Sequence, residues 1–250
     1  MNEWLDDLRT AVAFLTRLPM PHPQGASPEN FVRAHRLFPV VGAAIGAAVG
    51  LLCLGLRAIG LPDLAAAALA LGASALLTGA LHEDGLADVA DGFGGGRDPA
   101  AKLEIMRDSR LGTYGALMLL VIFVAKVSAL ATLPDAFVVQ GLIAAHALAR
   151  GVLPFMSMSL PYARKDGLAA NAGRPDSTTA ATAGALALIM AWLVLPWREA
   201  FCAALAAAAC AAGIAWLAQQ QIGGQTGDVL GGAEQLGETT ILLLLAATLA

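Results

Sequence analysis

Long apolar segments alternate with short polar ones along most of this chain. Seven of them approach or exceed the roughly 20 residues needed to cross a bilayer, at 37–59, 64–81, 114–133, 137–158, 179–197, 199–219 and 236–250. Residues 4–18 instead mix apolar and charged positions, as in an amphipathic helix that lies on the membrane or re-enters it. The pattern predicts an all-α protein: a polytopic integral membrane helical bundle of about seven transmembrane helices plus an N-terminal amphipathic or re-entrant helix.

Composition agrees with a membrane protein and excludes one broad function. Hydrophobic residues make up 58% of the chain and charged residues 14%, with a mean hydropathy of +0.68, unlike a soluble domain. The net charge of −4 leaves no overall basic surface for nucleic acid. We therefore expect one integral membrane domain, residues 1–250, which contacts the lipid bilayer and no nucleic acid. Glycines at 42, 46 and 50 permit tight helix contacts, within a subunit or in a homo-oligomer.

Basic residues are concentrated in alternate loops. The N-terminus and the loops 82–112, 158–177 and 222–235 contain Arg9, Arg17, Arg33, Arg36, Arg97, Lys102, Arg107, Arg110, Arg164, Lys165 and Arg174. The other loops contain only Arg57 and Arg198, and Lys126 and Arg150 fall inside spans. The positive-inside rule then predicts a multi-pass protein of the cytoplasmic (inner) membrane. The N-terminus and the loops 82–112, 158–177 and 222–235, which we expect to form the active site, would lie in the cytoplasm.

An acidic cluster follows the second span. Four carboxylates, those of Glu83, Asp84, Asp88 and Asp91, fall within one short run of the sequence. If this run is helical, the three aspartates share one face, where like charges repel unless a cation neutralises them. Hard oxygen ligands suit Mg²⁺ or Mn²⁺. We predict a catalytic metal site formed by these aspartates, with Asp91 as the general base; the alternative is a solvated acidic cap on a membrane helix.

Acidic residues and basic loops on one side of the membrane indicate the outline of a metal-dependent diphosphate site. Direct displacement by an acceptor hydroxyl is the simplest reaction. Membrane prenyltransferases and CDP-alcohol phosphotransferases use comparable acidic helices with Mg²⁺, so one alternative function is a transferase of either class. His146 and Arg150 lie one helical turn apart and could bind an anionic substrate. A second alternative is a small-solute transporter that uses these two residues and Lys126 as its mid-membrane site.

Six motifs sharpen this hypothesis. They are FLTRLP (14–19), RLFPVVG (36–42), EDGLADVADG (83–92), RDSRLGTYG (107–115), ARKDG (163–167) and GGQTGDVLG (223–231). In this order, over nearly the whole chain, they resemble the cobalamin-5′-phosphate synthase family, also called adenosylcobinamide-GDP ribazoletransferase. One departure is Val89, where the family's acidic motif has Thr.

The resemblance implies an Mg²⁺-dependent transferase that completes the nucleotide loop of cobalamin. Its donor would be adenosylcobinamide-GDP, its acceptor α-ribazole or α-ribazole 5′-phosphate, and its leaving group GMP; the product would be adenosylcobalamin or its 5′-phosphate. Carried onto this chain, the family's motifs assign roles as follows. The metal ligands would be Glu83, Asp84, Asp88 and Asp91, and the substrate-binding residues Arg36, Arg107, Asp108, Arg110, Arg164, Lys165, Thr226 and Asp228. The alternatives are ordinary positive-inside charge for 107–110 and a turn-forming role for Asp228.

Overall fold

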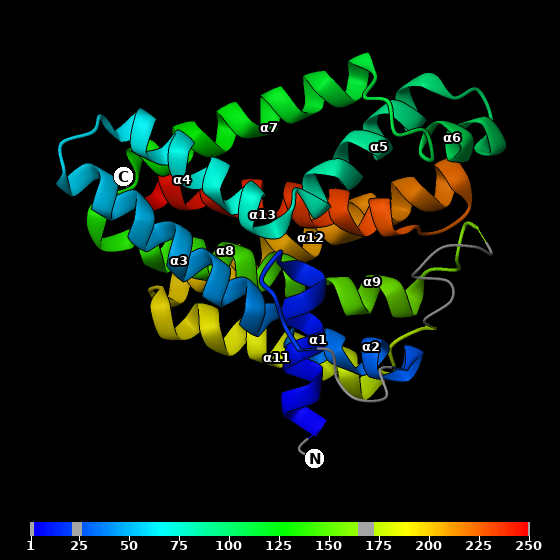
Figure 1. Cartoon of the computed structure of the whole chain (residues 1–250), viewed down its shortest axis with the longest axis horizontal. Helices are drawn as coiled ribbons and strands as arrows, with labels where there is room; N and C mark the ends of the chain where they lie inside the picture. Colours follow the sequence, from blue (N-terminus) through cyan, green and yellow to red (C-terminus); the bar gives the residue numbers. More distant parts are fainter. Residues whose placement is uncertain (1–2, 22–26, 165–172, 250) are drawn as a thin grey trace.

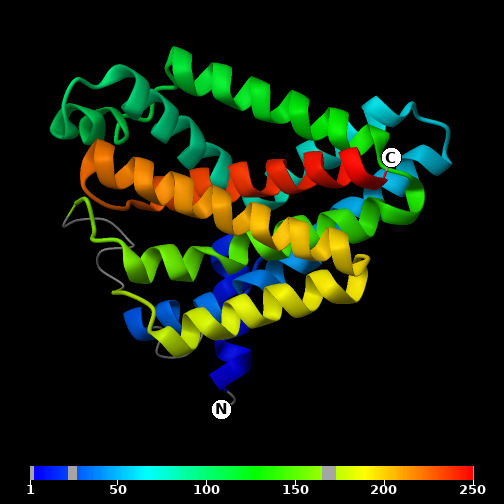
Figure 2. The ribbon, with the colours of Figure 1, turned by 180° about the vertical axis from the view of Figure 1, so that it is seen from behind.

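The computed structural model describes residues 3–21, 27–164 and 173–249. In these residues the helices are α1 (Glu3–Leu15), α2 (Pro28–Ala34), the 3₁₀ turn η1 (His35–Leu37), α3 (Phe38–Ala58), α4 (Asp63–Thr78), α5 (Leu81–Gly95), α6 (Pro99–Ile105), α7 (Thr113–Thr132), α8 (Asp135–Gly151), α9 (Leu153–Ser159), α11 (Ser177–Val194), α12 (Trp197–Ile222) and α13 (Gly227–Leu249). The long helices run side by side along the long axis of the molecule, and α1 crosses them (Figures 1 and 2).

The predicted fold class is confirmed. Six helical segments are long and apolar enough to cross a membrane, and the bent pair α4 and α5 would make a seventh if it is one span. The six are Pro28–Ala58, Thr113–Thr132, Asp135–Ser159, Ser177–Val194, Trp197–Ile222 and Gly227–Leu249. The predicted helix over 4–18 is present as α1, which is amphipathic and buries Asp7, Ala11 and Leu15.

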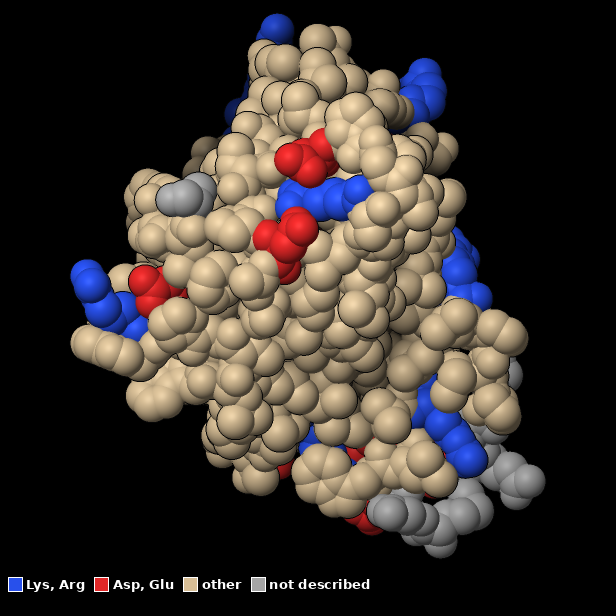
Figure 3. All heavy atoms as spheres, turned by 90° about the vertical axis from the view of Figure 1, so that its left-hand side faces the viewer, with Lys and Arg blue, Asp and Glu red and all other residues tan. Residues whose placement is uncertain are grey.

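The connections alternate between the two ends of the bundle, as the spans predict. At one end, Arg57 of α3 donates to the carbonyl of Leu133 at 3.1 Å and pairs with Asp135 at 2.7 Å and Asp63 at 3.3 Å. At the other end, the chain after α9 pairs with the chain before α13 through a β-bridge between Tyr162 and Gln225. Figure 3 shows the first end, where most of the surface in view is uncharged.

The second span ends earlier than the apolar pattern predicts. Helix α4 ends at Thr78. The next two residues, Gly79 and Ala80, adopt left-handed backbone conformations, with φ of 66° and 54°. Helix α5 then continues at an angle of 92° to α4. The backbone N–H of Arg17 donates to the carbonyl of Leu77 at 2.7 Å, so the chain after α1 is attached to this bend. Glycine provides the left-handed cap, but the Ala-rich sequence gives no periodic signal of where the helix ends.

The last span begins earlier than predicted, and two expected loops are largely helical. The glycine-rich segment 222–235 was expected to be a loop before a short span over 236–250, but α13 begins at Gly227. Similarly, 82–112 contains α5 and α6. The reason is a tertiary contact between α5 and α13. A Cβ at Gly231 would lie 3.2 Å from the carbonyl oxygen of His82 and 3.4 Å from the Cα of Gly85, so the two helices cross closely at these glycines. This packing stabilises both helices, although glycine has a low helix propensity.

Candidate active site

The crossing of α5 and α13 brings the two acidic motifs together. A Cβ at Gly85 would lie 2.9 Å from the backbone oxygen of Asp228, so the two backbones are in direct contact at this point. Asp88, one turn further along α5, is close enough to Asp84 and Asp228 to interact with both electrostatically. Residues more than a hundred positions apart in the sequence thus form one acidic group.

This group borders a cavity of about 280 Å³ at the end of the bundle. Asp84, Arg164, Thr226 and Asp228 line it. Arg164 pairs with Asp228 at 2.7 Å, and the Thr226 hydroxyl donates to the same carboxylate at 3.1 Å. The structure therefore brings together four residues that the sequence predicted for one site. Lys165, predicted to belong with them, lies outside the described residues.

Asp91 has a different environment from its neighbours on α5. Its Oδ2 accepts a hydrogen bond from the backbone N–H of Gly112 at 2.8 Å, and its Oδ1 accepts one from Gly115 at 2.9 Å. These donors lie at the start of α7, whose first N–H groups have no partner inside the helix. Asp91 was predicted as a metal ligand and general base; with both oxygens engaged, its geometry favours fixing the start of α7 against α5.

Replacing Asp91 by Ala is expected to lower the stability of the folded protein by about 1 kcal/mol, because two backbone donors lose their acceptor. Asp91→Asn keeps one carbonyl oxygen and should cost less. Thermal unfolding of the purified protein in detergent, followed by circular dichroism, measures both variants. Asp91→Asn with normal stability and no transferase activity would instead favour the metal-ligand role.

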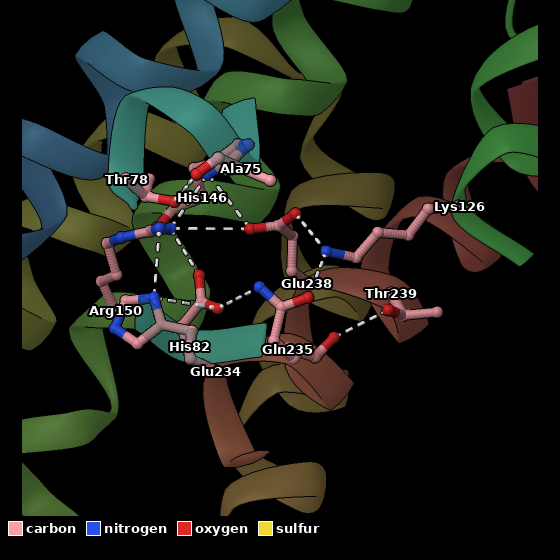
Figure 4. A network of polar contacts seen from close by, with 10 residues as sticks. All are labelled: Ala75, Thr78, His82, Lys126, His146, Arg150, Glu234, Gln235, Glu238 and Thr239. Carbon is pink, nitrogen blue, oxygen red and sulfur yellow. Dashed lines mark hydrogen bonds and ion pairs between the residues drawn. The ribbon is translucent and has the colours of Figure 1, made fainter. Parts of the chain in front are cut away.

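A second polar cluster lies inside the bundle (Figure 4). Its member His82 follows the bend between α4 and α5 and also borders the cavity. Its ionisable members come from four helices: His82, Lys126, His146, Arg150, Glu234 and Glu238. Arg150, 1% exposed, pairs with Glu234 at 2.5 Å, and Lys126 pairs with Glu238 at 2.7 Å. The two histidines lie beside the same carboxylates, His82 at 3.3 Å from Glu234 and His146 at 3.1 Å from Glu238.

This buried network changes the interpretation of several predicted site residues. His146 and Arg150 were expected to bind an anionic substrate, but both are buried and contact the protein's own carboxylates. Glu83 was expected to bind the metal beside Asp84, but it interacts electrostatically with Lys126 of the network. The cause is helical geometry: residues 83 and 84 point about 100° apart, so only one of them faces the cavity.

Sequence reasoning did not assign a role to His82, Gln235 or Glu238. Gln235 accepts a hydrogen bond from Lys126 at 2.7 Å and donates one to Glu234 at 3.0 Å, so it links the two halves of the network. The sequence did contain one signal of this network. An uncompensated charge inside a membrane span is costly, so Lys126 requires a buried acidic partner. The sequence pattern did not identify which acidic residue is that partner.

Among the described residues, one group of three side chains has metal-ligating atoms within 4.8 Å of one another: His146, Glu234 and Glu238. Arg150 and Lys126 already balance its two carboxylates, so it needs no cation. At the cavity, by contrast, Asp84 and Asp228 are lining residues, Asp88 interacts electrostatically with both, and Arg164 is the one lysine or arginine among the described residues that line the cavity. Mg²⁺ is usually held by one or two carboxylates together with water and substrate phosphates, so this oxygen-rich, acidic group fits the predicted metal better.

The remaining predicted substrate-binding residues do not line the cavity. Arg36 pairs with the buried Asp7 at 2.6 Å and covers the ring of Trp4 at 3.6 Å, which attaches α1 to the start of the first span. Arg110 contacts Asp108 at 2.5 Å on the exposed surface, and its side-chain hydrogen bonds hold the pKa of that carboxyl at about 2. Such an exposed pair contributes little to stability. Arg107 is also exposed in this segment.

The fold defines a polytopic helical membrane protein, and its acidic cavity lies at one end of the bundle. Residues 7–246 match the family model described as cobalamin-5-phosphate synthase. The chain belongs to this family, and the family resemblance drawn from its motifs is confirmed.

Similar proteins carry one name, adenosylcobinamide-GDP ribazoletransferase. The relative from Bradyrhizobium diazoefficiens is 46% identical over 243 residues, which cover 96% of this chain and 93% of that protein. A relative from Sinorhizobium sp is 40% identical and covers 99% and 98% of the two chains. The relative from Azorhizobium caulinodans is 41% identical over 251 residues, which cover 96% of this chain and 94% of that protein. No solved structure gives a significant match.

Proposed function

We propose that this protein transfers α-ribazole or its 5′-phosphate onto adenosylcobinamide-GDP, with release of GMP, at the cytoplasmic membrane. The ribose hydroxyl of the acceptor attacks the phosphorus attached to the cobinamide, the bond from that phosphorus to the GMP oxygen breaks, and the hydroxyl loses its proton. The observation that carries this proposal is that Asp84, Asp228 and Arg164 line one cavity, and that Asp88 interacts electrostatically with all three.

Each of these residues has a distinct task in the proposed reaction. Asp84 and Asp88 on α5, with Asp228 on α13, would hold Mg²⁺ and the phosphates bound to it. A bound metal neutralises phosphate oxygens and the charge that develops on the leaving group. Arg164 would exchange part of its contact with Asp228 for a phosphate oxygen, which a guanidinium can bind in bidentate fashion. Asp84 lines the cavity, so it is the α5 carboxylate within reach of the hydroxyl's proton.

The orientation in the membrane is also part of the proposal. The end of the bundle that carries the cavity is the end to which the basic loops belong, and the positive-inside rule then places it in the cytoplasm. Adenosylcobinamide-GDP and α-ribazole 5′-phosphate are soluble and carry phosphate, so a cytoplasmic cavity would reach them directly. The described C-terminal residues lie towards the opposite end (Figure 1), so a reporter fused after Ala250 should report the periplasm.

Reconstitution tests the reaction directly. We expect the purified protein in nanodiscs, given adenosylcobinamide-GDP and α-ribazole 5′-phosphate, to form adenosylcobalamin 5′-phosphate and GMP in equal amounts. The products are measured by mass spectrometry, with Mg²⁺ or with EDTA, and EDTA should abolish turnover. Folded protein without turnover would contradict the proposal, and CDP-diacylglycerol and a prenyl diphosphate would then test the other membrane transferase classes. Turnover that persists in EDTA would contradict the proposed Mg²⁺ requirement and leave the proposed reaction unaffected.

A further inference from the structure

The cavity has a second kind of lining besides its charged residues. Phe14 of α1, Phe31 of α2, His35 of η1 and Phe38 of α3 also border it. These rings come from the first 38 residues of the chain, whereas the acidic group comes from α5 and α13. The same cavity thus combines a phosphate-type region with an aromatic region, and the transfer chemistry uses only the first.

The four rings form a closed cluster. Phe14 contacts Phe31 edge to face at 4.8 Å between ring centroids and stacks with Phe38 at 5.7 Å. His35 contacts Phe31 edge to face at 5.0 Å and stacks with Phe38 at 4.4 Å. Phe38 and His35 are buried, 2% and 7% exposed, while Phe14 and Phe31 are only partly buried. The inner rings therefore hold the outer two in place, and the outer two offer their surfaces to the cavity.

One of the two ring nitrogens of His35 is already in use. The Nδ1 of His35 lies 2.9 Å from the carbonyl oxygen of Phe31, which can only accept, so Nδ1 carries a hydrogen and donates it. His35 thereby fixes the backbone that carries Phe31. What the cluster presents is mostly the carbon surface of aromatic rings, which suits a flat, apolar aromatic ligand.

The proposed reaction brings two aromatic bases to the protein, and they differ in polarity. Guanine, in the donor, carries several hydrogen-bonding groups on its edge, and each loses free energy if it is buried without a partner. The base of α-ribazole is a dimethylbenzimidazole, which has two methyl groups and one free ring nitrogen. Stacking on aromatic side chains is favourable for any base, but a region that is mostly carbon surface offers few hydrogen-bonding partners and therefore favours the apolar base.

We propose that Phe14, Phe31, His35 and Phe38 form the binding wall for the aromatic base of the acceptor. This inference rests on the proposed function of the acidic cavity, and it names the part of the chain that selects the acceptor. The ribose and phosphate then extend towards Asp84, Arg164 and Asp228, where the bond forms. Phe31 is one of the two partly exposed rings, and it contacts both Phe14 and His35.

Phe31→Leu tests the wall, since it removes the aromatic face but keeps an apolar side chain. We expect the KM of the acceptor to rise about 10-fold or more, with the KM of the donor unchanged within about twofold. Isothermal titration with α-ribazole alone should show the same weakening in Kd, and Phe31→Trp should restore binding. The matched control is Phe155→Leu, which alters a phenylalanine of α9 bordering a different, apolar cavity.

The outcomes separate the inference from the proposed function. If the wild-type protein turns over normally, two results for Phe31→Leu would overturn the base-binding wall: an unchanged KM for the acceptor, or a raised KM for the donor instead. Neither result would contradict the proposed reaction. Wild-type protein that binds α-ribazole through Phe31 but never turns over would overturn the reaction and support the wall. Circular dichroism and size-exclusion profiles equal to those of Phe155→Leu confirm that Phe31→Leu is folded.

Discussion

Asp88→Asn is expected to lower the rate of transfer by about 10²- to 10³-fold, the range seen when an active site loses one group that stabilises the charge developing in the transition state. Here that group would be the metal, because Asp88 interacts electrostatically with Asp228, Asp84 and Asp91 and its loss removes a negative charge from the proposed metal site. The amide has nearly the same size as the carboxylate, and the folded structure should therefore be retained.

The measurement is initial rate as a function of Mg²⁺ concentration with both substrates saturating. A lost metal ligand should raise the Mg²⁺ concentration needed for half-maximal rate as well as lower the maximum. Asp135→Asn is the matched control, because Asp135 is an exposed carboxylate paired with Arg57 at the other end of the bundle. Unchanged activity and Mg²⁺ dependence in Asp88→Asn would refute the acidic cavity as the metal site.

Arg150→Met is expected to destabilise the protein by about 3–5 kcal/mol, the typical cost of leaving a buried charge without its partner. Arg150 is 1% exposed and lies 2.5 Å from Glu234 and 3.6 Å from Glu238, so its removal leaves Lys126 to balance both carboxylates. The effect should be mainly on folding, since Arg150 does not line the cavity.

Denaturation in mixed detergent micelles, followed by circular dichroism, measures this loss. The double variant Arg150→Met with Glu234→Gln should recover part of the stability, because it removes the stranded charge as well as its partner. Arg198→Met serves as the control, since Arg198 is exposed. Equal stability of the Arg150 and Arg198 variants would mean that the network contributes nothing to the fold.

The network also bears on the transporter alternative. Lys126, His146 and Arg150 were its expected mid-membrane binding site, yet each contacts Glu234 or Glu238 within the bundle. A transport site needs groups that are free to bind a solute when one end opens. Charges that neutralise one another are instead what a helical bundle needs to place ionisable residues at depth.

The sequence by itself determined the fold class, the positions of most spans and the family. Apolar segments of membrane-spanning length must be helical, because no other structure except a closed barrel satisfies its backbone in lipid. The alternation of basic loops predicted which connections share an end, and the links from Arg57 to Asp135 and from Tyr162 to Gln225 agree with it. For the acidic run over 82–91, the spacing predicted only that the three aspartates share one face if the run is helical.

Only the tertiary structure decided what each residue of the acidic motif does. Within the first three turns of α5, Glu83 interacts with the buried network, Asp84 lines the cavity and Asp91 holds the start of α7. The spacing of these residues is the same in any helix, so it could not distinguish these environments. They are set by which helices pack on each face of α5, and that depends on Gly85 and Gly231, where the absence of side chains lets α5 and α13 touch.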